Sequence, residues 1–95
     1  MYYALHNTHS PFQAPRRFQE LYASNSSWPL EQTFNAMVSV VDEETKNVTT
    51  ALKAAGMWEN TVLVWMTDNG APIQSGGSNH PLKGGKGSNW CAILC

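Results

Sequence analysis

The chain has 95 residues, of which 42% are hydrophobic and 11% aromatic, a composition typical of a globular fold with one domain at most. Its six basic and seven acidic residues give a formal net charge of −1 without a basic stripe, which excludes nucleic acid as an expected partner. Every apolar run is far shorter than the roughly 18 residues of a membrane span, and Met1 leads straight into "YYAL" without a basic segment or a cleavage site. We therefore expect no membrane span and no signal peptide.

The N-terminal third alternates between a short apolar segment and polar breaks. "MYYAL" (1–5) predicts a short buried strand, and "HNTHSPFQAPRRF" (6–18), interrupted by two prolines, predicts a loop. "ASNSSWP" (23–29) predicts a second polar break.

From Leu30 the apolar residues recur at steps of three, four or seven, which indicates one face of a helix over roughly 30–55. Gly56 is the expected C-terminal cap, and Lys53 in the last turn suits the helix dipole. The residues of the apolar face are Phe34, Met37, Val38, Val41, Val48, Leu52 and Ala55.

"TVLVWM" (61–66) is apolar at nearly every position and predicts a strand buried on both faces, as in a parallel sheet covered by helices. The following 70–90 segment, rich in glycine, predicts a long functional loop. Strand, long helix and strand form a right-handed crossover unit of an α/β fold. Because ligands bind at the carboxyl ends of such strands, "HNTH" and "TDNG" are expected at the same sheet edge.

Asp68 and Asn69 offer a carboxylate and an amide carbonyl, hard oxygen donors that suit calcium or magnesium. Gly70 then lets the backbone turn away. The alternative is a plain type I′ hairpin turn at Asn69-Gly70, a common use of this triplet.

The histidines allow two interpretations. His6, His9 and His80 could form a zinc set, although residues three apart in an extended segment point to opposite faces. His9 alone, near Pro11, could act as a general acid or an anion donor, whereas the alternative is a surface histidine in a loop.

Lys83 and Lys86 lie among glycines in "PLKGGKG", where a lysine and nearby backbone N–H groups can bind an anion. The spacing is not that of a P-loop, and the alternative is a solvated lysine on a loop. Asn25 and Asn47 begin glycosylation sequons, and Asn47 falls about 220° around the helical wheel from Phe34, on the outward face.

Four stretches, in order along the chain, together resemble the sulfatase family, and most closely its arylsulfatase B type, the N-acetylgalactosamine-4-sulfatase type. They are "YYALHNTHSPFQAP", "FNAMVSVVDEETKNVTTALKAAGMWENTV", "VWMTDNG" and "GGSNHPLKGGKGSNW". The resemblance implies that residues 1–90 are a central fragment of the sulfatase N-terminal domain, with an alkaline-phosphatase-like α/β fold. Residues 91–95, with Cys91 and Cys95, are then a divergent tail that forms neither a disulfide framework nor a zinc set.

The resemblance also implies roles for four residues. In sulfatases the Asp-Asn of this motif binds a divalent cation, usually Ca2+, and here it is Asp68 and Asn69. The histidine that contacts the sulfate and is placed to protonate the leaving alcohol aligns with His9. The lysine that holds sulfate oxygens aligns with Lys86, not Lys83. A cation, a lysine and a histidine would together stabilise charge on the sulfuryl and leaving oxygens.

The sequence also departs from the family pattern. The formylglycine nucleophile of the family is made from the cysteine of C-x-P-x-R, a motif that these residues lack. The family's upstream paired aspartates and Lys-x-His set are also missing. "CAILC" follows Trp90 in place of Glu-Gly-Gly, and His80 stands where the arylsulfatase B type has tryptophan.

We therefore expect a parent activity of sulfate ester hydrolysis, on sugars or aryl alcohols, and expect this chain alone to be inactive. Two alternatives stay open: a non-catalytic truncated relative that binds a divalent cation or a sulfated glycan, and a phosphate or phosphonate ester hydrolase of the same fold. The family resemblance implies a lysosomal or secreted destination. Poor solubility is expected, because sheet edges and an apolar helix face would lack cover.

Overall fold

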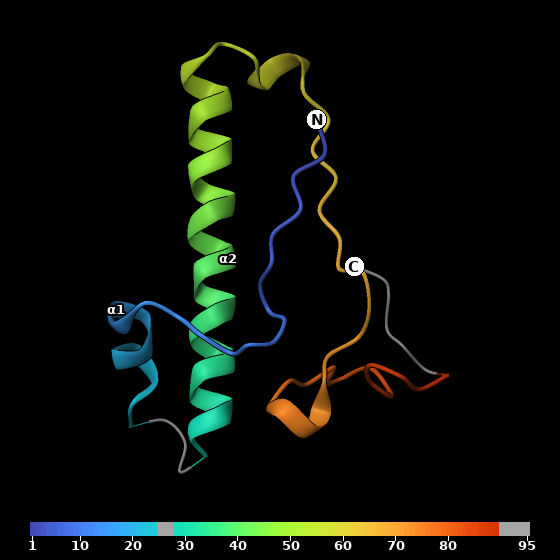
Figure 1. The fold of residues 1–95 in the computed structure, drawn as a ribbon. Coiled ribbons are helices and arrows are strands. Elements are labelled where there is room, and N and C mark those ends of the chain that lie inside the picture. Colours follow the sequence, from blue (N-terminus) through green and yellow to red (C-terminus); the bar gives the residue numbers. More distant parts are fainter. Residues whose placement is uncertain (25–27, 90–95) are drawn as a thin grey trace. The chain divides into compact units, whose positions relative to one another are not determined.

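The longest of the described helices is α2 (Pro29–Ala54), with 26 residues, which runs the length of the view in Figure 1. The structure, a computed structural model, describes residues 1–24 and 28–89. The chain divides into two units, Met1–Val62 and Leu63–Cys95, and α2 belongs to the first. No helix among the described residues is long and apolar enough to cross a membrane.

The two ends of α2 follow from local sequence chemistry. Pro29 occupies the first helical turn, where the N–H that proline lacks is not needed. At the other end Gly56 has a φ of 66°. The N–H groups of Gly56 and Met57 donate to the carbonyls of Lys53 and Leu52, both at 3.0 Å, which is a Schellman motif. The helix predicted from the periodicity, with its glycine cap, is confirmed.

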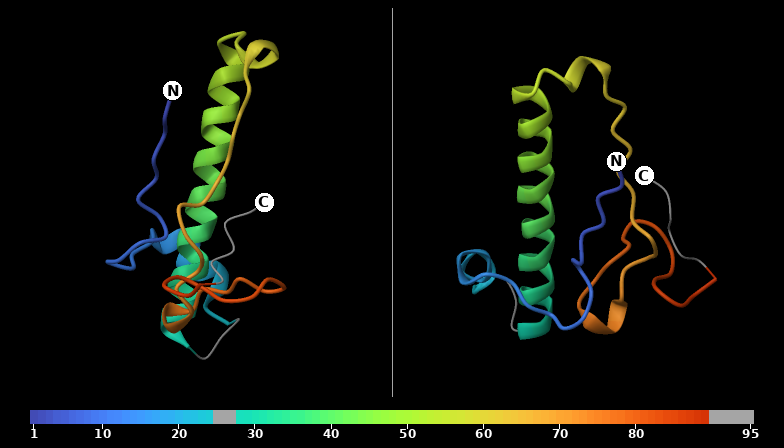
Figure 2. Two further views of the ribbon diagram at one scale, coloured as in Figure 1. Left: turned by 90° about the vertical axis from the view of Figure 1, so that its right-hand side faces the viewer. Right: turned by 45° about the horizontal axis from the view of Figure 1, so that its top comes forward.

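Beyond α2 the chain turns back through the 3-10 helix η2 (Trp58–Asn60), as the two views of Figure 2 show. The Lys53 ammonium lies 4.9 Å from the centroid of the Trp58 ring, a cation–π contact. The Thr61 hydroxyl donates to the Met57 carbonyl at 2.7 Å. These contacts fix the direction in which the chain leaves the helix.

The core of the first unit is small and surrounds the N-terminal half of α2. Its buried apolar side chains are Phe18, Phe34, Ala36 and Met37. Part of the predicted helical face is confirmed, whereas Val38 is 47% exposed. Burial thus decreases along α2: its buried side chains lie between Phe34 and Met37, whereas Ala51 and Lys53 near its end are exposed.

A short helix, α1 (Arg16–Gln19), packs against α2 together with the 3-10 helix η1 (Glu20–Tyr22). Arg17 Nη2 lies 2.7 Å from the Glu43 carboxylate, and the Tyr22 and Ser39 hydroxyls share a hydrogen bond of 2.7 Å. The prediction of a loop throughout 6–18 is therefore wrong at its end. Pro15 is the N-cap residue of α1, and its carbonyl accepts the N–H groups of Phe18 at 2.9 Å and Gln19 at 3.3 Å.

The segment before α1 is also fastened to α2. The Asn7 side chain donates to the Met37 carbonyl at 3.2 Å, and the Phe12 ring lies 6.3 Å from the Phe34 ring. Near the N-terminus the Tyr3 hydroxyl donates to Glu44 Oε2 at 3.4 Å. The turn that contains His6 and His9 therefore lies beside α2.

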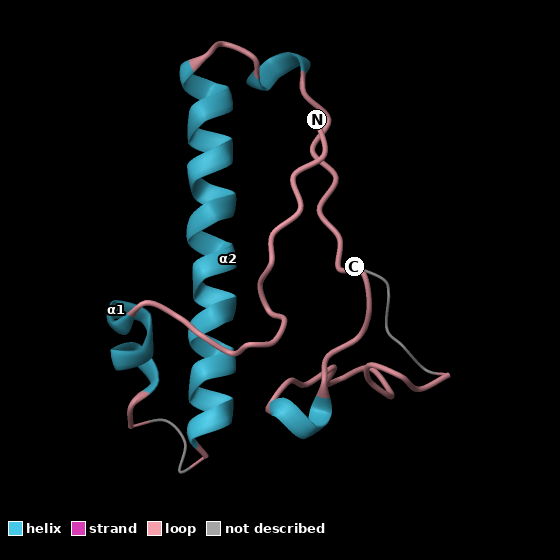
Figure 3. Cartoon of the chain, in the orientation of Figure 1, coloured by secondary structure: helices cyan, strands magenta, loops and turns pink. Residues whose placement is uncertain are grey.

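The two predicted strands are not formed: Figure 3 shows helices and loops, and no strand, in the described part of the chain. The prediction that both segments are buried is wrong, because 1–4 and 62–66 are exposed, Val62 to 91%. An isolated strand leaves its N–H and C=O groups unpaired and both faces in water, so it requires neighbouring strands. The alkaline-phosphatase-like sheet and its crossover unit therefore stay predictions.

The second unit, described from Leu63 to 89, is mostly irregular, as predicted for the loop after the apolar segment. Its regular element is the 3-10 helix η3 (Ile73–Ser75), which ends at Gly76, whose φ is 88°. Among residues 63–89 the buried residues are the glycines Gly70, Gly77 and Gly85. Hydrogen bonds, rather than an apolar core, therefore hold this described part of the unit together.

Candidate functional site

Asp68 and Asn69 lie at the exposed end of the apolar 62–66 segment. Asp68 is exposed and Asn69 half-buried, and Asn69 Nδ2 donates a short hydrogen bond to Asp68 Oδ1. The Thr67 hydroxyl donates to the Asn69 carbonyl at 2.8 Å. The two side chains therefore lie on the same side of the backbone, with their polar ends together.

The hairpin alternative for this triplet is wrong. A type I′ turn requires positive φ at both central residues, and neither Asn69 nor Gly70 has one. Instead of a returning strand, the chain continues through Ala71 and Pro72 into η3.

The donor chemistry of Asp68 and Asn69 fits part of a calcium shell. Half a turn of the Asn69 amide about its terminal torsion would put its Oδ1 beside the carboxylate, which gives adjacent hard oxygen ligands. Calcium takes roughly six to eight oxygens, so these side chains supply a minority of them. The described residues hold no group of three or more His, Cys, Asp or Glu that could complete a metal site.

The backbone of Lys86 is hydrogen-bonded to the chain just after Asp68 and Asn69. Its N–H donates to the carbonyl of Ala71 at 2.9 Å, and its side chain is exposed. Ala71 follows Asp68 by three positions. Within the second unit the lysine loop is therefore hydrogen-bonded to the chain just after the acidic segment.

A residue that the sequence interpretation missed, Asn79, connects the same two segments. Its Oδ1 accepts the N–H of Ala71 at 2.8 Å, and its Nδ2 donates to the carbonyl of Gly84 at 3.0 Å. The available signal was an amide side chain between two glycine pairs in "GGSNHPLKGG", since a loop without an apolar core needs polar side chains to bind its backbone.

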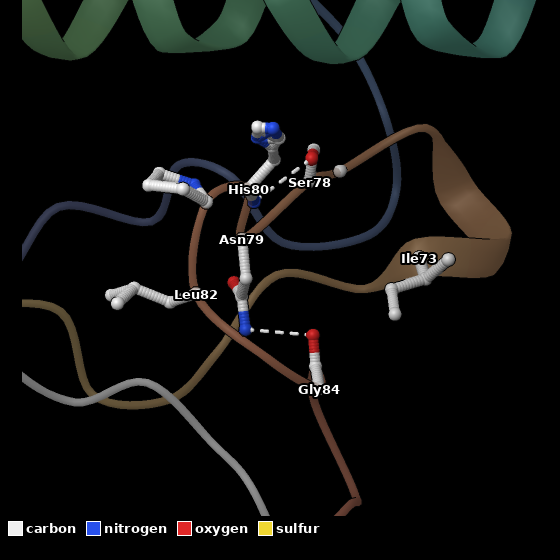
Figure 4. Close-up of a pocket in the computed structure, with 8 residues that line it drawn as sticks. Ile73, Ser78, Asn79, His80, Leu82 and Gly84 are labelled. Atoms are coloured by element: carbon white, nitrogen blue, oxygen red, sulfur yellow. Dashed lines mark hydrogen bonds between the residues drawn. The ribbon is translucent and has the colours of Figure 1, made fainter.

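Asn79 also lines a shallow cavity of about 320 Å³, shown in Figure 4. The Ser78 hydroxyl accepts the backbone N–H of His80 at 3.1 Å on its rim. The lining residues are Ile73, Gly77, Ser78, Asn79, His80, Pro81, Leu82 and Gly84. The His80 side chain is exposed there.

His9 belongs to the first unit, whereas the other candidate residues belong to the second. Its ring Nδ1 lies 3.0 Å from the Ser10 carbonyl oxygen. A carbonyl oxygen can only accept, so this bond requires the proton on Nδ1 and makes Nε2 the nitrogen for proton transfer to a ligand.

His6 and His9 do not point to opposite faces, because the segment is not extended. The N–H of His9 donates to the His6 carbonyl at 3.1 Å in a turn, and the two rings meet edge to face at 5.9 Å. His80 belongs to the other unit, and no cluster of three metal-binding side chains occurs in residues 1–24 and 28–89. The zinc interpretation has no support in this geometry.

Asn47, the sequon asparagine of α2, is exposed, as predicted for the outward face of the helix. The other sequon asparagine, Asn25, lies outside the described residues, as do Trp90 and the predicted tail 91–95 with Cys91 and Cys95.

The chain was compared with known proteins. The family model for Sulfatase matches residues 1–92. Arylsulfatase J of Mus musculus is 42% identical over 90 residues, which cover 95% of this chain. The chain spans 15% of the length of that curated relative. Because the family match covers nearly the whole sequence, the chain belongs to the sulfatase family.

Proposed function

We propose that this chain supplies part of the sulfate ester site of a sulfatase, the cation ligands and the sulfate-binding lysine. The hydrogen bond from Lys86 to Ala71 carries this proposal, because it ties the lysine loop to the backbone just after Asp68 and Asn69. A lysine ammonium near a bound cation would stabilise the negative charge of a sulfuryl group. The reaction class is the hydrolysis of sulfate esters.

Each residue has a distinct role in this proposal. Asp68 and Asn69 would hold Ca2+, which when bound supplies positive charge next to the sulfate oxygens. Lys86 would bind a sulfate oxygen with its exposed ammonium. His9 would protonate the leaving alcohol through Nε2, since the bond from Nδ1 to the Ser10 carbonyl keeps the ring in place.

The substrates of this proposal are sulfated sugars or aryl sulfates, as in the arylsulfatase B type. The match to the Sulfatase family favours sulfate over phosphate or phosphonate esters. Residues 1–90 act as part of the sulfatase N-terminal domain, with 91–95 as a divergent tail. A lysosomal or secreted destination accords with the exposed sequon asparagine Asn47 as a glycan acceptor.

A second candidate function is binding without turnover. The 95 residues contain no C-x-P-x-R motif and therefore no precursor of the family's formylglycine. The exposed Asp68 and Lys86 would still bind a divalent cation or a sulfated glycan weakly. We expect the chain alone to release no sulfate from 4-nitrophenyl sulfate above a Lys86→Ala control.

The test is a pair of NMR titrations of the 95-residue chain, one with calcium chloride and one with sodium sulfate. Asp68→Ala is expected to abolish the calcium-induced shifts of residues 68–70, whereas Asp42→Ala, which removes an exposed acid of α2, leaves them. Lys86→Ala is expected to weaken sulfate binding, with Lys83→Ala as the matched control. Equal effects of a variant and its control would show nonspecific charge binding and contradict the proposal.

A further inference from the structure

We propose that Asn79 is the positioning residue that holds Lys86 in register with the Asp68–Asn69 segment. Its side chain joins the two backbone stretches through hydrogen bonds to Ala71 and Gly84. Gly84 precedes Lys86 by two positions, and Ala71 follows Asn69 by two. The inference deepens the proposed function and rests on it, since it assigns Lys86 to the sulfate and Asp68 and Asn69 to the cation.

Both peptide groups of Ala71 take part in this connection. Its N–H donates to Asn79 Oδ1 at 2.8 Å, and its carbonyl accepts the N–H of Lys86 at 2.9 Å. Asn79 Nδ2 donates to the Gly84 carbonyl at 3.0 Å. Two connections therefore join Ala71 to the lysine loop. One is the backbone hydrogen bond from Lys86, and the other is the Asn79 side chain, which bonds both Ala71 and Gly84.

Hydrogen bonds also close the turn that contains Lys86. The Ser88 hydroxyl donates to the Gly85 carbonyl at 2.9 Å, and the Ser88 N–H donates to the same carbonyl at 3.0 Å. The Lys86 backbone thus lies in a tight turn from Gly85 to Ser88. The turn is fastened to the rest of the unit at Ala71 and Gly84, so these two anchors set where the lysine side chain begins.

The chemistry of the amide explains why asparagine serves this purpose. An amide offers an acceptor and a donor on neighbouring atoms, which matches the N–H of Ala71 and the carbonyl of Gly84. Aspartate retains the acceptor and loses the donor, whereas alanine loses both. The bond to Gly84 can therefore be removed alone, in Asn79→Asp, or together with the bond to Ala71, in Asn79→Ala.

The test measures hydrogen exchange of the Ala71 and Lys86 amides in the 15N-labelled 95-residue chain, followed by a titration with sodium sulfate read at Lys86. Asn79→Ala is expected to speed both exchange rates about 5- to 30-fold, the factor that corresponds to one or two lost hydrogen bonds. The dissociation constant for sulfate is expected to rise about fivefold. Amides of α2 are expected to exchange at unchanged rates.

Asn79→Asp separates the two bonds. It is expected to preserve the slow exchange of Ala71, while Lys86 exchanges faster and sulfate binds more weakly. Ser78→Asp is the charge-matched control, because it adds the same negative charge one residue away and leaves both Asn79 bonds in place. A larger loss of sulfate affinity in Asn79→Asp than in Ser78→Asp supports positioning of Lys86 through Gly84.

Three outcomes would overturn the inference. If Asn79→Ala leaves sulfate binding unchanged while Lys86→Ala abolishes it, Asn79 does not position the lysine and the proposed function stands. If Asn79→Ala speeds exchange in α2 as much as at Lys86, its role is general stability. If Lys86→Ala itself leaves sulfate binding unchanged, the proposed function fails and the inference fails with it.

Discussion

Gly85 faces the carbonyl oxygen of Ala71 with no room for a side chain between them: a Cβ built on Gly85 would lie 2.7 Å from that oxygen. The same Cβ would lie 2.8 Å from the Ile73 side chain. The lysine loop and the chain after Asn69 therefore meet at van der Waals distance, in addition to their hydrogen bonds.

Gly85→Ala is expected to displace the Lys86 loop and to cost about 1–3 kcal/mol of local stability, as overpacking does elsewhere. Faster hydrogen exchange at the Lys86 amide measures the displacement. Gly87→Ala is the control: its φ of 82° strains an alanine, but nothing lies within 4 Å of the added Cβ. An unchanged exchange rate of the Lys86 amide in Gly85→Ala would show that the loop accommodates the methyl group without displacing Lys86, and would contradict the prediction.

Gly56→Ala is expected to destabilise the end of α2 by about 1–2 kcal/mol, because the φ of 66° at the Schellman cap disfavours a side chain. Urea unfolding followed by circular dichroism measures the change. Gly56→Asn is expected to cost less, since asparagine adopts this conformation more readily. The same loss in both variants would argue against backbone strain as the cause.

Phe18→Ala is expected to destabilise the first unit by about 3 kcal/mol, because it empties a buried position between α1 and α2. Arg17→Ala is expected to cost less than about 1 kcal/mol, since its ion pair with Glu43 is largely exposed. Denaturant unfolding of both variants gives the comparison. A greater loss of stability in Arg17→Ala than in Phe18→Ala would contradict the prediction that apolar packing, rather than the ion pair, holds α1 against α2.

Val64→Lys is expected to reduce self-association of the chain, because the 62–66 segment presents adjacent exposed apolar side chains. Sedimentation velocity over a concentration series measures the change. Leu21→Lys, at an exposed apolar position of η1, is the control and is expected to have a smaller effect. Identical sedimentation of wild type and Val64→Lys would contradict this prediction.

The sequence predicted α2 well because its causes are local. Pro29, the apolar period and Gly56 each act within a few residues, so they predict the helix without knowledge of what it packs against. The two predicted strands depend on distant pairing, and the exposed Val62 shows that composition alone does not bury a strand. The long helix could therefore be predicted from local sequence, whereas the short helix α1 was missed and the sheet, which needs distant pairing, stays a prediction.

The residues of the candidate site also differ in how well the sequence predicts them. Asp68, Asn69 and Lys86 could be chosen from their chemistry and their motifs. Asn79 could not, because its bonds reach eight residues back and five residues forward and depend on the path of the loop. Its place between two glycine pairs marks Asn79 as a side chain that can bind backbone, but does not tell which N–H and which carbonyl it binds.

The backbone bonds of Ala71 have a consequence for natural variation. Since its N–H and carbonyl are both engaged, a replacement that keeps both groups and fits the half-buried site would serve at this position, yet proline would not. Asn79, whose side chain makes the contacts, should tolerate far fewer replacements. Among related sequences, position 71 is therefore expected to avoid proline, while position 79 varies little.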